Sequence, residues 1–267
     1  MTTLFFPRDT ILVAGPSACG KTKALNQLRE ELSHLGVAYD HIPLTDSHTI
    51  VDRMLEDDRV NNGRGHYHPW CEGDVSGHDH LNGHATLPFT LAGESIATNM
   101  MIDFWKGLYS LPQDGNIHLA ELSAGVNINP DSEPASRTNL SFETLVKRLM
   151  DGTYPSAGLS RVRAIIHPQT DDEERLILNL HRGIPSEKEI VEGTASFVLS
   201  PTAMKIFGRD DFSPFFSTYA SETHDIPIYS FLNDGEPATI EKAVKTAVPE
   251  VIHGFGGIEG NRRGIER

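Results

Sequence analysis

A glycine-rich stretch at residues 15–22 constrains this chain more than any other feature of its sequence. It runs Gly-Pro-Ser-Ala-Cys-Gly-Lys-Thr and matches the spacing G-x-x-x-x-G-K-T. Residues 10–14 before it form a short apolar run, and leucines recur at helical spacing in residues 23–35 after it. A strand, a glycine loop and a helix in this order are typical of a phosphate-binding loop (P-loop), where backbone N–H groups and a helix amino terminus face an anion. We therefore expect a site for ATP or GTP.

The residue types in this loop have separate tasks. Glycines allow the backbone to curl so that its N–H groups point at the phosphates. Lys21 is expected to reach the β- and γ-phosphates, and the hydroxyl of Thr22 to bind Mg²⁺. The predicted nucleotide-binding residues are Gly15, Ser17, Ala18, Cys19, Gly20, Lys21 and Thr22.

Strand-like and helix-like segments alternate along the rest of the chain. We expect further strands at 37–44, 116–122, 161–167 and 226–232, and helices at about 50–55, 91–111, 140–150, 171–183 and 238–247. This alternation predicts a three-layer α/β/α P-loop fold, in which helices cover both faces of a mostly parallel five-stranded sheet. We expect a single domain over 1–267 with an insertion at 61–88, a lid-like region at about 175–222 and a flexible tail at 254–267.

Composition argues against several classes of partner. The formal net charge of −14 would repel a nucleic-acid backbone, so we expect no nucleic-acid partner, while small anionic substrates remain compatible with the N–H groups of the loop. No apolar run approaches the roughly 20 residues of a membrane span, and the amino terminus lacks the basic region of a signal peptide. The two cysteines, Cys19 and Cys71, do not suggest a disulfide, which favours a reducing cytoplasm. Nothing in the sequence indicates an oligomeric state.

Two acidic residues follow predicted strands and are candidates for the chemistry of the site. Asp46 and Glu121 both lie at carboxyl ends of strands, the edge where open α/β sheets bind ligands. An acidic residue after an apolar strand commonly holds Mg²⁺ or its water, and we expect this role for Glu121. Asp46 has two interpretations, a base toward the acceptor and an N-cap of the following helix.

The P-loop and the order of elements make the sequence similar to P-loop kinases of the nucleoside and nucleotide kinase type. The resemblance spans most of the chain in element order, while its specific motif is confined to residues 15–22. It implies an ATP-dependent phosphotransferase that moves the γ-phosphoryl group of Mg-ATP to a small-molecule acceptor. The acceptor itself cannot be named from this resemblance, because the arginine that several such kinases carry just after the position of Glu121 is absent.

The resemblance also implies roles for individual residues. The acidic residue near the phosphoryl acceptor corresponds to Asp46, and lid arginines correspond to Arg175, Arg182 and Arg209. For Arg175 and Arg182, a solvated and salt-bridged helix face is an equal alternative. Arg53 occupies a position where related enzymes hold an acceptor phosphate or base, although a surface arginine is the simpler interpretation.

The insertion at 61–88 is dense in histidine. Its candidate ligands for a transition metal such as Zn²⁺ are His66, His68, Cys71, His78, His80 and His84. Their spacing fits no standard zinc module, and the alternative is a mobile Gly/His-rich lid over the substrate. Tyr67 and Trp70 in the same insertion could stack on an acceptor base or sugar, or simply pack against the protein.

A second hypothesis follows from the same insertion: a nucleotide-driven protein that handles metal ions. Residues 121–125, Glu-Leu-Ser-Ala-Gly, are loosely similar to the Glu-x-x-Gly element of metallochaperone GTPases. Those GTPases read guanine through an Asn-Lys-x-Asp element, and Asn233-Asp234 lacks the lysine. The sequence therefore favours the kinase interpretation over this one.

Overall fold

Five parallel strands form the centre of the protein. The computed structural model describes residues 8–16, 18–45, 84–85, 91–124, 141–180, 198–199 and 209–253. Within them the sheet has the order β2-β4-β1-β5-β7, and every described strand pair is parallel. The strands are β1 (Thr10–Gly15), β2 (Tyr39–Thr45), β4 (Ile117–Ser123), β5 (Val162–Gln169) and β7 (Ile228–Leu232). The three-layer α/β fold expected from the sequence is therefore confirmed.

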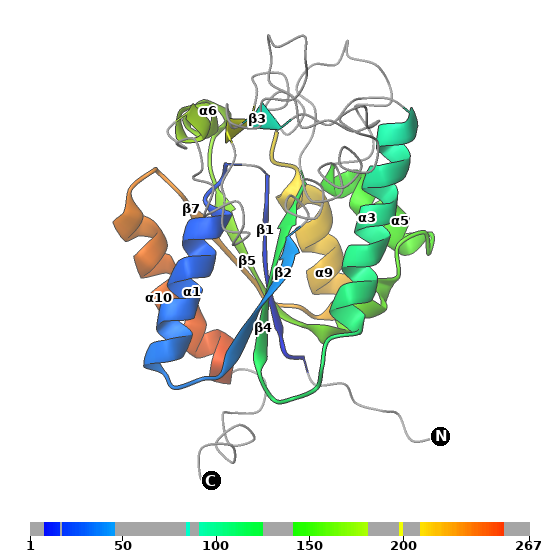
Figure 1. Ribbon diagram of the computed structural model, residues 1–267. Coiled ribbons are helices and arrows are strands. Elements are labelled where there is room, and N and C mark those ends of the chain that lie inside the picture. Colours follow the sequence, from blue (N-terminus) through cyan, green and yellow to red (C-terminus); the bar gives the residue numbers. More distant parts are fainter. Residues whose placement is uncertain are drawn as a thin grey trace, which may run out of the picture.

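Helices cover both faces of this sheet (Figure 1). One face is covered by α1 (Lys21–His34) and α10 (Pro237–His253), and the other by α3 (Leu91–Tyr109), α5 (Phe142–Met150) and α9 (Thr218–His224). The remaining described helices are α6 (Asp172–Leu180), the 3₁₀ helix η2 (Ser156–Arg161) and the π-helical turn η3 (Phe212–Ser217). No helix among the described residues is both long enough and apolar enough to cross a lipid bilayer.

The central strand β1 is buried along its whole length because it has a neighbour on each edge and helices on each face. Its side chains alternate between the two faces, as the two-residue period of a strand requires. Ile11 and Val13 belong to the core cluster under α1 and α10, whereas Leu12 and Ala14 belong to the opposite cluster. A continuous apolar run such as residues 11–14 is typical of a parallel strand buried on both faces.

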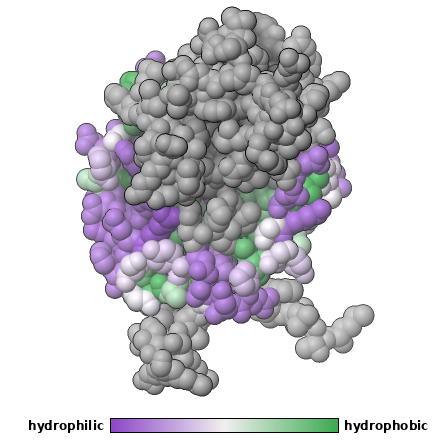
Figure 2. Space-filling view, viewed as in Figure 1, coloured by the Kyte–Doolittle hydropathy of each residue, from purple (hydrophilic) through white to green (hydrophobic). Residues whose placement is uncertain are grey.

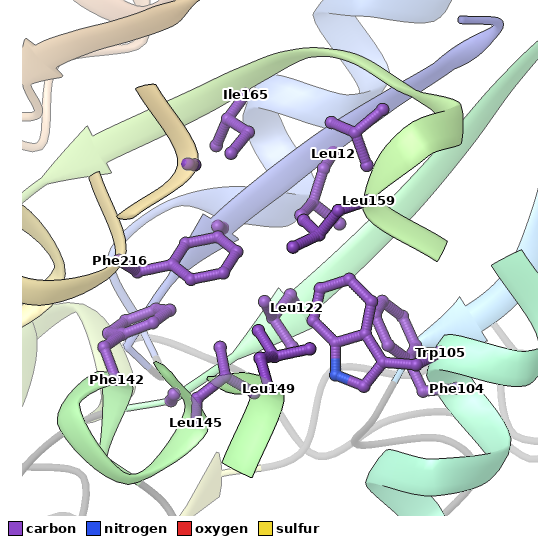
Figure 3. Packing of buried hydrophobic residues seen from close by; sticks show 14 of the residues in the cluster. Leu12, Phe104, Trp105, Leu122, Phe142, Leu145, Leu149, Leu159, Ile165 and Phe216 are labelled. Atoms are coloured by element: carbon purple, nitrogen blue, oxygen red, sulfur yellow. The ribbon is translucent and has the colours of Figure 1, made fainter. Parts of the chain in front are cut away.

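The larger core cluster is rich in aromatic side chains (Figure 3). Trp105 meets Phe104 edge to face, with ring centroids 5.2 Å apart, and Phe142 stacks on Phe216 at 5.7 Å. These rings lie between the sheet and α3, α5 and η3, and Leu12 contributes from β1. Aromatic pairs of this kind add about 0.5–1.5 kcal/mol beyond the area that they bury.

The chain leaves the carboxyl ends of the neighbouring strands β1 and β4 toward opposite faces of the sheet. From β1 the chain passes through α1 to the edge strand β2, then returns through β4 and crosses β1 to β5 and β7. Helix α1 follows β1 on one face, while α5 follows β4 on the other. Where neighbouring strands send their connections to opposite faces, open α/β sheets bind ligands beyond the strand ends.

The observed elements differ from the expected ones in three places. A second, two-stranded parallel sheet pairs β3 (His84–Ala85) with β6 (Val198–Leu199), and so joins the insertion to the lid-like region. Helix α10 continues to His253, past its expected end at 247 and through Pro249. Burial of Val248, Val251 and Ile252 favours this extension, and Arg163 donates to the carbonyls of Val251 and Ile252 at 2.8 and 3.0 Å. The short helices η2 and η3 are the third difference.

The surface of the described part is mostly polar in the view of Figure 2, with apolar residues in small scattered patches. Helix α1 illustrates this distribution. Its apolar side chains are buried on one face and include Ala24, Leu25, Leu28 and Leu32, so that mostly polar side chains remain on the surface. This one-sided pattern is that of an amphipathic helix packed on a sheet.

Arg161 holds the amino-terminal edge of the sheet together. Its guanidinium makes a bidentate ion pair with Asp9, with Nε and Nη2 at 3.0 and 2.5 Å from the two carboxylate oxygens. The other N–H groups donate to the carbonyls of Tyr109, Leu111 and Pro112. Because a guanidinium has five N–H donors, the whole group is satisfied while it is 1% exposed. The network joins β1, the start of β5 and the end of α3.

We predict that Arg161→Met lowers the free energy of unfolding by about 3–5 kcal/mol, because it leaves the Asp9 carboxylate buried without its partner. Urea denaturation followed by circular dichroism measures this loss. Arg161→Lys should be intermediate, since an ammonium keeps the charge but not the bidentate geometry. The matched control is Lys147→Ala, which removes an exposed pair with Glu143 and should change stability by less than about 0.5 kcal/mol. Equal losses in Arg161→Met and Lys147→Ala would contradict the prediction.

Candidate functional site

The loop between β1 and α1 turns sharply in a few residues. Ala18 has φ 64° and Gly20 has φ 102°, so two of its residues lie in the left-handed region. Glycine adopts such a φ at little cost, whereas alanine does not, and a strained residue of this kind persists only where its surroundings enforce it. The Cys19 N–H lies 3.4 Å from the carbonyl of Pro16, which closes the turn. Strain of this sort concentrates at binding sites.

Two side chains from other strands hold the loop in place. The carbonyl oxygen of Cys19 accepts hydrogen bonds from Asn233 Nδ2 at 2.9 Å and from Thr170 Oγ1 at 3.1 Å. Thr170 follows β5 and Asn233 follows β7, and both are buried. The loop is therefore fixed by the ends of two strands beyond its own.

Close packing requires glycine at both ends of the loop. A Cβ atom on Gly20 would lie 2.6 Å from Asn233 Nδ2, inside any normal contact distance. A Cβ atom on Gly15 would lie 2.7 Å from the sulfur of Cys19. The two motif glycines are thus needed for close approach as well as for backbone conformation.

Lys21 is the first residue of α1 and is buried beside the loop. Its ammonium donates to the carbonyl of Pro16 at 2.8 Å and lies 3.8 Å from Glu121 Oε1. The register explains this pairing: Glu121 lies opposite Val13 of β1, and its neighbours Ala120 and Leu122 face the core away from α1. Glu121 consequently points to the α1 side. The structure brings together these two residues, which the sequence predicted for one site, while Thr22 is exposed at the same helix end.

Several charged groups act on the buried thiol of Cys19 in the loop. Burial raises the pKa of this thiol, Lys21 and Arg175 oppose the shift, and Asp210 and Glu121 reinforce it. Lys21 is on α1, Glu121 on β4 and Arg175 on α6, and Asp210 comes before η3 in the chain.

Arg175 is buried, with 1% of its surface exposed. Its Nη2 donates to Asp172 Oδ1 at 2.8 Å. Burial lowers the pKa of its guanidinium, and the carboxylates of Asp172 and Asp210 oppose that shift. The alternative offered from the sequence, a solvated and salt-bridged helix face, is therefore wrong about solvation for Arg175 but right about an ion pair within the helix. Arg209, the third expected lid arginine, is exposed.

Four residues near the loop were missed by the sequence analysis. Thr170 and Asn233 anchor the Cys19 carbonyl, and His167 and Asp210 lie beside them on the β5 side. Three of the four end or follow a parallel strand, so the rule that selected Glu121 could have selected them. Asp210 has no such signal, because only the tertiary fold brings it to this edge.

The other predicted site residues fall outside the described part of the chain. These are Ser17, Asp46, Arg53, His66, Tyr67, His68, Trp70, Cys71, His78, His80 and Arg182. The backbone of His84 pairs with Val198 in the small second sheet. Within the described ranges, no group of three or more His, Cys, Asp or Glu side chains is arranged to hold a metal ion.

We predict that Cys19 reacts slowly with iodoacetamide, because its thiol is buried and its raised pKa leaves little of the reactive thiolate at pH 8. Asn233→Ala should accelerate the reaction by about tenfold, since loss of a hydrogen bond of about 1.4 kcal/mol loosens the loop. Mass spectrometry of proteins with Cys71→Ser in the background measures the rates.

Asn26→Ala on the exposed face of α1 is the matched control and should leave the rate unchanged. If Cys19 in the native protein reacts as fast as in urea, the buried arrangement of the loop is contradicted.

Two comparisons with known proteins found no match for this chain. No protein-family model matches the sequence, and no curated protein matches it significantly. The site is therefore defined by its own residues and geometry.

Proposed function

We propose that this protein is an ATP-dependent phosphotransferase of the small-molecule, nucleoside or nucleotide kinase type. The observation behind the proposal is the position of Lys21, which is buried at the start of α1, behind a loop of left-handed residues and 3.8 Å from Glu121. A cation, a helix amino terminus and a carboxylate are thus gathered at the sheet edge where α/β folds bind ligands.

The described residues fit the separate needs of phosphoryl transfer. This reaction requires a cradle for the β- and γ-phosphates, a Mg²⁺ ion and positive charge for the equatorial oxygens. In the proposal the loop amides and Lys21 hold the phosphates, and Thr22 and Glu121 hold Mg²⁺ or its water. Arg175, the buried cation of α6, neutralises charge on the transferred group. The nucleotide is ATP, with GTP as the alternative donor.

The charge arrangement supports binding of an anion together with a divalent cation. Lys21 is already paired with Glu121 and the Pro16 carbonyl, and Arg175 with Asp172. A triphosphate would offer both cations new partners and leave Glu121 beside the phosphates. A carboxylate in that position favours Mg²⁺, because this ion is usually held by one or two carboxylates together with the phosphate oxygens of the substrate.

We predict that Lys21→Ala weakens binding of a fluorescent ATP analogue by about 10- to 100-fold. The reason is that a hydrogen bond to a charged group contributes about 1.5–3 kcal/mol, which corresponds to this change in affinity. Because the change leaves the buried Glu121 carboxylate without its partner, circular dichroism of the same variant checks that it is folded in the binding assay. Lys23→Ala removes an exposed lysine two residues along the same helix and should bind normally. Wild-type protein that binds no adenine or guanine nucleotide would end the proposal.

We predict that Glu121→Gln leaves nucleotide affinity within about threefold but raises the Mg²⁺ concentration needed for half-maximal turnover by about 10- to 100-fold, as for other residues that orient metal ligands. Titration of Mg²⁺ at saturating ATP, with nucleosides, nucleotides and small alcohols as acceptors, measures the effect. Glu30→Gln on the exposed face of α1 is the control. An unchanged Mg²⁺ requirement in Glu121→Gln would remove Glu121 from the metal site.

A further inference from the structure

His167 and Asp210 form a dyad on the side of the P-loop opposite Glu121. His167 lies on β5, and Glu121 on β4, so that β1 separates them. His167 Nε2 lies 2.9 Å from Asp210 Oδ2. The imidazole is also next to the loop, because a Cβ atom on Gly15 would lie 3.5 Å from its Cδ2. The dyad is therefore a second polar group at the edge of the loop.

The surroundings of His167 fix both its orientation and its tautomer. The ring is fully buried and stacks on Phe212, with centroids 3.8 Å apart and planes at 23°. Nδ1 lies 3.3 Å from the hydroxyl of Ser230, its register partner on β7. A carboxylate can only accept, so in the neutral imidazole Nε2–H donates to Asp210 and Nδ1 accepts from Ser230.

Asp210 is held firmly but stays accessible. Its Oδ2 accepts from His167 and its Oδ1 accepts the N–H of Phe212 at 3.0 Å, yet 17% of its side chain is exposed. Each carboxylate oxygen has a second lone pair. The charge of Asp210 also acts on Cys19 and Arg175, so the carboxylate lies within electrostatic reach of the loop and of the buried arginine.

The next residue, Asp211, shows what a structural carboxylate looks like in the same segment. Asp211 is 5% exposed, and its two oxygens accept the N–H groups of Phe142 and Glu143 at the start of α5, at 3.1 and 3.0 Å. This is a helix cap. Asp210 differs from Asp211 because it is bonded to the buried imidazole that borders the loop and keeps part of its side chain exposed.

We propose that Asp210 is the catalytic base toward the phosphoryl acceptor and that His167 is its positioning residue. The assignment rests on the proposed function, with Mg-ATP as donor and a hydroxyl group, including that of water, as acceptor. Asp210 takes the proton from the acceptor O–H as the acceptor oxygen bonds to the γ-phosphorus. The bond from the γ-phosphorus to the β–γ bridging oxygen breaks and its electron pair leaves with ADP. The carboxyl proton is then lost to solvent.

The His167 ring supports the role of Asp210 as a base by orienting its carboxylate. An imidazole that donates to Oδ2 orients the carboxylate and leaves its outer lone pairs directed to the open side. Because the ring is buried and already bonded at both nitrogens, it acts through Asp210 and touches no substrate. General bases placed in this manner contribute about 10²- to 10⁴-fold to rate.

The first test is Asp210→Asn, with ATP binding and ATP consumption measured on the same protein. Removal of a negative charge beside the phosphates should leave the affinity for ATP unchanged or raise it, while turnover falls by about 10²-fold or more. Glu222→Gln, an exposed carboxylate on α9, is the control and should change neither quantity. A purely structural Asp210 would instead lose binding and turnover together.

The second test uses two replacements of His167. Gln places an amide N–H near the position of Nε2, whereas Phe keeps a ring for stacking on Phe212 but has no donor. His167→Gln should therefore retain most turnover, and His167→Phe should lose at least about tenfold in kcat with KM for ATP nearly constant. Equal turnover in the two variants would overturn the positioning role.

Asp46, the base expected from the sequence, supplies the decisive comparison. If Asp46→Asn abolishes turnover and Asp210→Asn does not, the assignment of Asp210 is wrong while the phosphotransferase proposal stands. Wild-type protein that binds ATP but consumes none with water or any acceptor in the panel would also overturn the assignment. Protein that binds no nucleotide would instead refute the proposed function itself.

Discussion

The complete burial of β1 is the constraint on which the rest of the structure depends. The strand has hydrogen-bonded neighbours on both edges and apolar clusters on both faces, so its end at Gly15 opens onto the middle of the carboxyl edge. The chain must turn there within a few residues, because α1 has to pack back onto the sheet. That turn puts the loop and the start of α1 at the carboxyl edge of the sheet, where β1 lies between β4 and β5.

The loop keeps its shape through contacts that are distant in sequence. Thr170 and Asn233 hold the Cys19 carbonyl, and the approach of Asn233 leaves no room for a side chain at Gly20. A hydrogen-bonded carbonyl also prevents the loop from relaxing out of the left-handed conformation of Ala18. If the loop binds a nucleotide as proposed, a backbone that is already ordered reduces the entropic cost of binding.

The two edges of the sheet have different chemistry. At the amino-terminal edge, Arg161 has every donor satisfied and Asp9 as its ion-pair partner, so this edge is closed and contributes to stability. At the carboxyl edge, Lys21 and Glu121 form an ion pair beside the loop, and Arg175 and Asp210 also act electrostatically on its Cys19 thiol. Both cations are paired in the structure, Lys21 with Glu121 and Arg175 with Asp172.

The sequence by itself determined the five strands of the parallel sheet and the loop after the first of them, because local signals specify them: apolar runs, glycines at fixed offsets and helical spacing of leucines. It also placed Glu121 near Lys21, since carboxyl ends of parallel strands share one edge. Only the tertiary structure decided that Arg175 is buried, that Asn233 and Thr170 anchor the loop, and that His167 supports Asp210. Those relations join residues 43 to 214 positions apart, and no periodicity or spacing encodes which side chains the packed core brings into contact.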